Sequence, residues 1–212
     1  MGKPNFPIST RLAPLPPKKF FECLVFLKSF VLKFKINLLT IGFQCLKNLN
    51  NFKLIFSAHG LPERNIKKGD PYQWQVEQSV NKIIEQLNIP NLDWILSYQS
   101  KIGPLKWIGP STDNEIVKSS KLNKTIVVVP IAFVSEHSET LVELDIEYKK
   151  LAEQNGCKNF IRIPALGTKH EFINSLANLV FKSNLLEKGL SFYHPLNKCP
   201  NDFKKCPCSD KL

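Results

Sequence analysis

The sequence lacks any long uninterrupted apolar run. Its most apolar stretch, residues 20–46, is broken by charged residues and an asparagine, and the longest continuous apolar run within it is Cys23 to Leu27. A membrane-spanning helix needs about 20 consecutive apolar residues. This stretch is therefore expected either to lie on a membrane surface as a basic amphipathic helix or to pack on the protein itself. The first apolar run begins only near Phe20, which argues against a secretory signal.

Acidic residues are scarce near the start of the chain. Residues 1–50 hold eight Lys/Arg and one acid, a net charge of +7, whereas residues 51–212 hold 21 Lys/Arg and 17 acids, a net charge of +4. No stripe of interleaved arginine and aromatic side chains accompanies this basic charge, so nucleic acid is not an expected partner.

The six cysteines do not have the spacing of a disulfide framework, because three of them crowd into the last fourteen residues. A reducing compartment is therefore expected, and with it a cytoplasmic location. Contact of residues 20–46 with the inner membrane would make the protein peripheral to that membrane.

The chain divides by composition into three parts. Residues 1–50 form an atypical basic, Phe-rich extension with five prolines among the first nineteen residues, residues 51–188 a domain, and residues 189–212 a cysteine-containing tail. Within the domain, apolar runs predict strands near residues 53–57, 92–98, 125–133 and 160–163, and helical spacing predicts helices near residues 70–87, 113–120, 138–154 and 170–182. Alternating strands and helices predict an α/β fold, in which helices flank a parallel sheet.

Two of the predicted strands end in residues that carry chemistry. His59 follows the first strand directly, and the segment from Phe133 to Glu139 follows the third. Ligands of such sheets bind beyond the carboxyl ends of the strands, so these two segments locate a candidate site.

A metal site is one of two interpretations of this region. His59 taken alone is more commonly a structural residue, and Glu139, Glu143 and Glu147, spaced four apart, form either a solvated acidic face or a row that handles a metal ion. Imidazole and carboxylate together suit a borderline divalent cation such as ferrous iron. Imidazole also exchanges protons near neutral pH.

Four sequence blocks resemble the ferrochelatase family, bacterial and mitochondrial alike. They are SAHGLP at residues 57–62, GDPY at 69–72, YQSKIGPLKWIGPSTD at 98–113 and VVVPIAFVSEHSETLVELDIEY at 127–148. Their order and spacing match the C-terminal half of that family, and the resemblance runs from about Lys53 to Ser183.

The resemblance implies an enzyme of haem biosynthesis, a lyase that inserts ferrous iron into a porphyrin and converts protoporphyrin IX to protohaem. Its partners would be the porphyrin and ferrous iron, and the iron enters as a substrate. The residues that match family positions are His59 and Glu139 as catalytic and metal-binding groups, Glu143 and Glu147 as a metal-binding row on a helix with a π-type distortion, Trp107 and Tyr72 at the porphyrin, and His137 as a motif position.

The late cysteines have a separate interpretation. Cys199, Cys206 and Cys208 alone suit a zinc site or an idle group of thiols. They resemble the C-terminal cysteine pattern of ferrochelatases that carry a 2Fe–2S cluster, which needs four thiolates. Candidates for the fourth are Cys23, Cys45 and Cys157.

The N-terminal half of the family, which supplies the opposite wall of the porphyrin cleft, has no counterpart in the resemblance, and residues 11–50 do not match what should precede SAHGLP. An alternative function follows: a truncated, catalytically inactive remnant that binds metal or porphyrin. An apolar face toward the absent half is then expected to be exposed unless residues 20–46 cover it.

Overall fold

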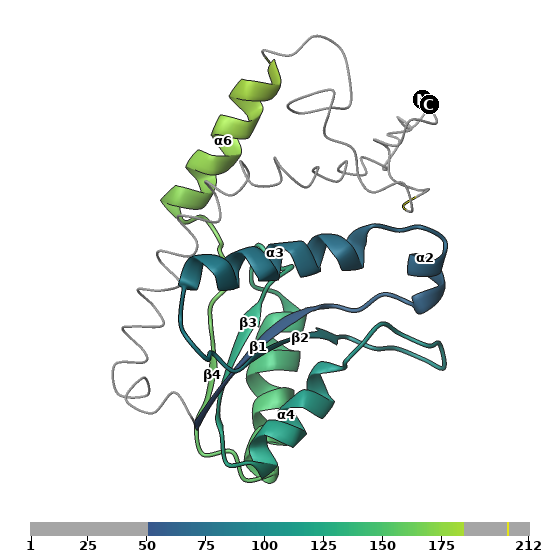
Figure 1. The fold of residues 1–212 in the computed structure, drawn as a ribbon, viewed down its shortest axis with the longest axis vertical. Helices are drawn as coiled ribbons and strands as arrows, with labels where there is room; N and C mark the ends of the chain where they lie inside the picture. The colour runs from purple at the N-terminus through teal and green to yellow at the C-terminus, as the bar shows by residue number, and fades with distance from the viewer. Residues whose placement is uncertain (1–50, 185–202, 204–212) are drawn as a thin grey trace, which may run out of the picture.

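The computed structural model describes residues 51–184 and Phe203. In this part of the chain four parallel strands form one sheet in the order β2-β1-β3-β4 (Figure 1). The strands are β1 (Phe52–His59), β2 (Trp94–Gln99), β3 (Thr125–Pro130) and β4 (Phe160–Arg162). The predicted fold class, a parallel sheet flanked by helices, is confirmed.

The helices fall close to their predicted places. They are α2 (Glu63–Lys67), α3 (Tyr72–Leu87), α4 (Thr112–Lys121), η2 (Glu139–Tyr148), α5 (Lys149–Gln154) and α6 (His170–Asn184). The short helix α2 was not predicted. The strand expected to reach Phe133 ends at Pro130, because the chain turns out of the sheet there and the Phe133 ring packs 5.1 Å from the ring of His137 instead.

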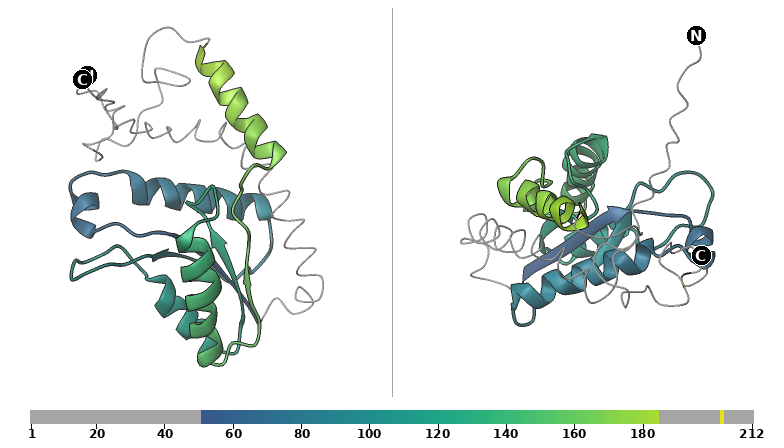
Figure 2. Two further views of the ribbon diagram at one scale, coloured as in Figure 1. Left: turned by 180° about the vertical axis from the view of Figure 1, so that it is seen from behind. Right: turned by 90° about the horizontal axis from the view of Figure 1, so that it is seen from above.

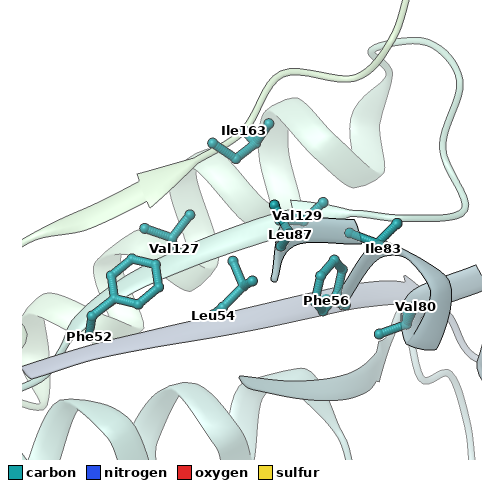
Figure 3. Packing of buried hydrophobic residues seen from close by; sticks show 9 residues of the cluster. All are labelled: Phe52, Leu54, Phe56, Val80, Ile83, Leu87, Val127, Val129 and Ile163. Carbon is teal, nitrogen blue, oxygen red and sulfur yellow. The ribbon is translucent and has the colours of Figure 1, made fainter. Parts of the chain in front are cut away.

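One face of the sheet packs against α3. Side chains alternate along a strand, so Phe52, Leu54 and Phe56 of β1 point to the same face, where they meet Val127 and Val129 of the neighbouring strand. Figure 3 shows these residues with Val80, Ile83 and Leu87 of α3 and with Ile163. Helical spacing of three to four residues gives α3 the matching apolar stripe.

The opposite face packs against α4, η2 and α5. Ile55 of β1 and Val128 of β3 meet Ile116 of α4, Leu144 of η2 and Ala152 of α5. Helices thus cover both faces of the sheet, with α3 on one side and α4 on the other (Figures 1 and 2). This second face is the one that carries the candidate site at its carboxyl edge.

The predicted helix at residues 138–154 has two geometries. Residues Glu139–Tyr148 form a π-helix, as the family resemblance implied, and α-helical geometry resumes over Lys149–Gln154. Hydrophobic spacing alone had indicated one continuous α-helix.

Helix α6 stands away from the sheet (Figure 2) and exposes Ile173, Leu176, Val180 and Phe181. Leu141, Val142 and Ile146 of η2 are also exposed, so the described residues do present apolar side chains to solvent. No helix within residues 51–184 is long and apolar enough to cross a membrane. The predicted extension at residues 1–50 and the tail at residues 189–212 lie outside the described residues apart from Phe203, whose ring packs 5.6 Å from that of Trp74.

Candidate functional site

The carboxyl ends of β1 and β2 bring His59 and Gln99 side by side. The two residues are partners in the parallel register. Two-residue alternation places His59 on the same face of β1 as Ser57 and Ile55, the face covered by α4 and η2. A strand-end histidine therefore meets the π-helix through the geometry of the sheet, although eighty residues separate His59 from Glu139 in the sequence.

Buried polar side chains fix Gln99 in one orientation. Its Oε1 accepts a hydrogen bond from Ser57 Oγ at 2.7 Å, and the Ser57 hydroxyl also lies 2.9 Å from Thr112 Oγ1. Ser97 Oγ lies 2.9 Å from the same Thr112 oxygen. Because Oε1 is committed to the sheet, the Gln99 amide nitrogen faces η2, where it donates to the Glu139 carbonyl at 2.9 Å.

His59 and Glu139 form the centre of the site. His59 Nε2 lies 3.5 Å from Glu139 Oε1, and each side chain is 36% exposed. His59 Nδ1 lies 2.6 Å from the Gly60 carbonyl oxygen. A carbonyl only accepts, so Nδ1 carries the hydrogen, and in the neutral imidazole Nε2 keeps its lone pair toward Glu139. The pair thus offers a proton acceptor next to a carboxylate, both reachable from solvent.

Tyr72 supports the backbone of His59 through a hydrogen bond. Its hydroxyl donates to the His59 carbonyl oxygen at 2.8 Å, and its backbone N–H donates to Asp70 Oδ1 at 3.0 Å at the start of α3. Burial raises the pKa of Tyr72 to about 12, and the negative charges of Glu139 and Asp70 add to this rise. The hydroxyl therefore remains a hydrogen-bond donor through the physiological range.

Trp107 lies beside His59, with 6.5 Å between their ring centroids. Its segment pairs with the residues that follow β1, since Ile108 N–H donates to the Leu61 carbonyl at 2.9 Å. Gly60 permits the close approach: a Cβ at this position would lie 3.1 Å from Trp107 Cε3. The aromatic ring and the imidazole thus form adjacent parts of one surface.

His137 caps the start of the π-helix. Its Nδ1 accepts from the Glu139 N–H at 3.2 Å, and its backbone N–H donates to Thr140 Oγ1 at 3.0 Å. Backbone N–H groups in the first turn of a helix have no partner within the helix, and the His137 side chain satisfies one of them. This motif histidine therefore orients the turn that carries Glu139.

Arg162 at the end of β4 ties the π-helix to the sheet. Its Nε donates to Asp145 Oδ1 of η2 at 2.8 Å, and a second guanidinium nitrogen pairs with Asp145 Oδ2. A third nitrogen donates to Glu136 Oε1 at 2.6 Å. The Arg162 side chain is only 10% exposed, so this cluster is partly shielded from water.

The predicted acidic row is not assembled as one metal-binding set. Of its three members, Glu139 faces His59, whereas Glu147 is exposed. Glu143 Oε1 accepts from the Ser100 N–H and from the Tyr148 hydroxyl, both at 2.8 Å. Among residues 51–184 and Phe203, no three or more His, Cys, Asp or Glu side chains are close enough together to hold a metal ion.

The predicted cluster cysteines Cys199, Cys206 and Cys208 lie outside the described residues, as do Cys23 and Cys45. Cys157, proposed as a fourth ligand, is buried in the core beneath α5, and its Sγ lies 3.3 Å from the Asn159 carbonyl. It therefore sits within packed protein.

Sequence reasoning missed Gln99, Ser100 and Arg162. Each is a polar residue at or just beyond the carboxyl end of a strand, and that position was a usable signal, because such ends share one edge of a parallel sheet. Their partners could not be inferred, since these depend on how η2 docks.

Comparison with known proteins gives concordant results. A family model described as "Ferrochelatase" matches residues 26–184. The chain is 69% identical over 163 residues to a ferrochelatase of Pelagibacter ubique (strain HTCC1062), covering 77% of this chain and 47% of that protein. It is 51% identical over 161 residues to a ferrochelatase of Rickettsia typhi (strain ATCC VR-144 / Wilmington), covering 75% of this chain and 47% of that protein.

The family match begins at residue 26, well before Lys53, so part of the segment that was expected to lack a family counterpart does have one. The chain spans about half the length of the curated relatives that it matches. Since the family model covers more than half of the chain and several relatives share 50% identity or more, this chain belongs to the ferrochelatase family.

Proposed function

We propose that this chain supplies one wall of a site that inserts ferrous iron into a porphyrin, converting protoporphyrin IX to protohaem in haem biosynthesis. The observation that carries the proposal is the solvent-accessible pair in which His59 Nε2 lies 3.5 Å from Glu139 Oε1. The names of the matched relatives support the same activity.

In the proposed reaction two pyrrole N–H protons leave the macrocycle as ferrous iron binds the four ring nitrogens. His59 Nε2 accepts the first proton with its lone pair, because Nδ1 already carries the other hydrogen, and it accepts the second proton in the same way once the first has been passed on. Glu139, next to it, stabilises the imidazolium that forms and passes the proton on to solvent. The carboxylate also attracts the incoming Fe²⁺ ion, for which imidazole and carboxylate are suitable ligands.

The porphyrin would lie against Trp107. An indole offers a broad apolar surface for a flat aromatic ligand, and Ile102 and Leu105 of the same loop expose 73% and 39% of their surface. Tyr72, also predicted at the porphyrin, directs its hydroxyl to the His59 carbonyl. We therefore assign Tyr72 to the support of His59.

The proposed roles of Glu143 and Glu147 differ. Glu147 is exposed, and a part in guiding iron toward Glu139 stays a prediction for it. Binding of iron by Glu143 would have to displace the hydrogen bonds that its carboxylate already accepts.

The experiment is anaerobic insertion of Fe²⁺ or Zn²⁺ into protoporphyrin by the purified chain, followed by absorbance. His59→Ala and Glu139→Gln are expected to lower the rate by about 10²–10⁴-fold, the usual contribution of a positioned acid or base. His170→Ala, at an exposed position of α6, is the matched control and should retain the wild-type rate. Equal rates for all four proteins would contradict the proposed roles.

A second candidate is binding of metal or porphyrin without turnover. It is favoured by the extent of the match, since the chain corresponds to about half of each relative. Folded wild-type chain that quenches porphyrin fluorescence but forms no metalloporphyrin would support this candidate over the first. Quenching that is lost in Trp107→Ala would place the bound porphyrin at the site described above.

A 2Fe–2S cluster on Cys199, Cys206 and Cys208 stays a prediction that rests on their resemblance to the C-terminal cysteine pattern of cluster-bearing ferrochelatases. The three thiolates are one fewer than the cluster requires. Iron and sulfide bound after anaerobic reconstitution, and lost in Cys206→Ser, would support it.

A cytoplasmic location is likewise proposed, from the spacing of the cysteines. Peripheral membrane contact is proposed from the basic and apolar composition of residues 20–46. Binding to anionic phosphatidylglycerol vesicles at low ionic strength, with release by added salt, is the expected result. Absence of binding at low salt would end this proposal.

A further inference from the structure

Glu143 lies at the centre of a hydrogen-bond cluster that joins the π-helix to the end of β2. Its Oε1 accepts from Ser100 N–H at 2.8 Å and from the Tyr148 hydroxyl at 2.8 Å. Its Oε2 accepts from Ser100 Oγ at 2.6 Å and from Gln99 Nε2 at 2.9 Å. A carboxylate offers about four lone-pair positions, so these contacts use its accepting capacity.

The main partner, Ser100, has an unusual backbone. Its φ angle is +62°, in the left-handed region that residues other than glycine rarely adopt. Such a conformation persists only when the surrounding structure holds it in place. The Glu143 carboxylate binds both the backbone N–H and the side-chain hydroxyl of Ser100, so it supplies two restraints at the strained residue.

The strained Ser100 turn lies at the start of the loop formed by residues 101–111. This loop leaves the sheet at Ser100 and returns where Tyr98 N–H donates to the Pro110 carbonyl at 2.9 Å. Within it the Ile102 carbonyl accepts from Trp107 Nε1 at 3.0 Å. Ile102 is two residues from Ser100, so the direction in which the chain leaves Ser100 contributes to where this carbonyl meets the indole, together with the pairing of Trp107 and Ile108 with Pro62 and Leu61.

We infer that Glu143 is a positioning residue whose carboxylate clamps the strained Ser100 turn and thereby holds the Trp107 indole beside His59. This role is distinct from the metal binding expected for the acidic row. The clamp operates in the chain without substrate or metal, so its test does not depend on turnover, and failure of the proposed function would leave it standing.

The test uses the full chain, metal-free and labelled with fluorotryptophan. The chain has three tryptophans, and Trp107→Phe assigns the Trp107 fluorine resonance. Glu143→Gln retains the size of the side chain, but its NH₂ group must face either the Ser100 N–H or the Gln99 amide, both of which donate. We expect the Trp107 resonance to shift or broaden, while that of Trp94, which packs edge-on against Phe56 in the sheet, stays in place.

A second measurement addresses the turn itself. Hydrogen exchange should show protection of the Ser100 amide reduced by about tenfold or more in Glu143→Gln, because a charge-assisted hydrogen bond is lost. Glu147→Gln removes the same charge from an exposed position of the same helix and is expected to change neither signal.

Wild-type Trp107 signal and Ser100 protection in folded Glu143→Gln would overturn the inference. So would an equal change in Glu147→Gln, because the effect would then come from charge alone. If Glu143→Gln does not fold, Ser100→Ala decides the question. It removes the 2.6 Å contact to Oε2 and must still perturb Trp107, and an unperturbed resonance there would refute the clamp.

Discussion

Arg162 is expected to hold the helix that carries Glu139 in its place on the sheet. β4 places the guanidinium on the face covered by η2, because Arg162 pairs in register with Val128, whose side chain lies in the cluster on that face. There it binds Asp145 through two nitrogens and Glu136 through a third. The test substitution is Arg162→Met, which keeps an unbranched chain but removes every donor.

The loss of folding free energy expected for Arg162→Met depends on how exposed Arg162 and its two acidic partners are. Removing one member of a fully buried ion pair costs about 3–5 kcal/mol, whereas exposed pairs contribute about 0–1 kcal/mol. Arg162 is 10% exposed, but the side chains of Glu136 and Asp145 are 33% and 34% exposed. An intermediate loss of about 2–3 kcal/mol is therefore expected. For a domain of 150–250 residues this corresponds to a fall in Tm of about 4–12 °C.

The loss of stability in Arg162→Met should also depend on pH. Burial alone would raise the pKa of Glu136, but hydrogen bonds from Thr140, Arg162 and the Ala165 N–H outweigh it and lower that pKa below the ordinary value. A carboxyl group whose pKa is lower in the folded state stabilises the protein above its unfolded pKa, about 4.3 for glutamate. This stabilisation is lost as the pH falls through the folded pKa. The difference in Tm between Arg162→Met and wild type should therefore be largest near neutral pH and shrink in acid, as the pH falls below the unfolded pKa of about 4.3.

Thermal unfolding followed by circular dichroism, at neutral and at acidic pH, provides the measurement. Arg64→Met makes the same change at an exposed position of α2 and is expected to leave Tm within about 1–2 °C of wild type, since most surface substitutions change stability by less than about 0.5 kcal/mol. An unchanged Tm in Arg162→Met, or a loss that is as large at acidic as at neutral pH, would show that the Arg162 ion pairs do not stabilise the docking of η2.

Two further predictions concern the support of the site. Gly60→Ala would place a Cβ 3.0 Å from the Gln99 carbonyl oxygen and 3.1 Å from Trp107 Cε3, so it should destabilise the chain by about 1–3 kcal/mol, and an unchanged midpoint in urea would contradict this. Tyr72 should ionise only near its raised pKa of about 12, so its stabilising contribution is complete below the unfolded pKa of about 10 and is lost as the pH rises toward the folded value. The wild-type minus Tyr72→Phe difference in tyrosinate absorbance measures this pKa, and a midpoint near the ordinary value of about 10 would show that burial does not protect the hydroxyl.

The local elements and the positions of the main chemical groups could be predicted from the amino-acid sequence. Near-continuous apolar runs give strands covered on both faces, and this pattern placed β1 and β3. Helical spacing of apolar residues placed α3. His59 directly after one strand and Glu139 soon after another were sufficient to predict that both lie near one edge of the sheet, because parallel strands share their carboxyl ends.

The contacts that those groups make depend on how the elements pack together. The family resemblance implied metal binding by Glu143, and its spacing alone left a solvated acidic face equally open. Its donors in the structure, Gln99 and Ser100, come from the end of β2 and reach it because η2 docks there. Arg162 reaches Asp145 for the same reason. Sequence periodicity fixes which side of an element is apolar, but strand register and the docking of a helix depend on contacts between residues far apart in the chain. The polar groups at the end of a strand could therefore be located from the sequence, while their partners could not.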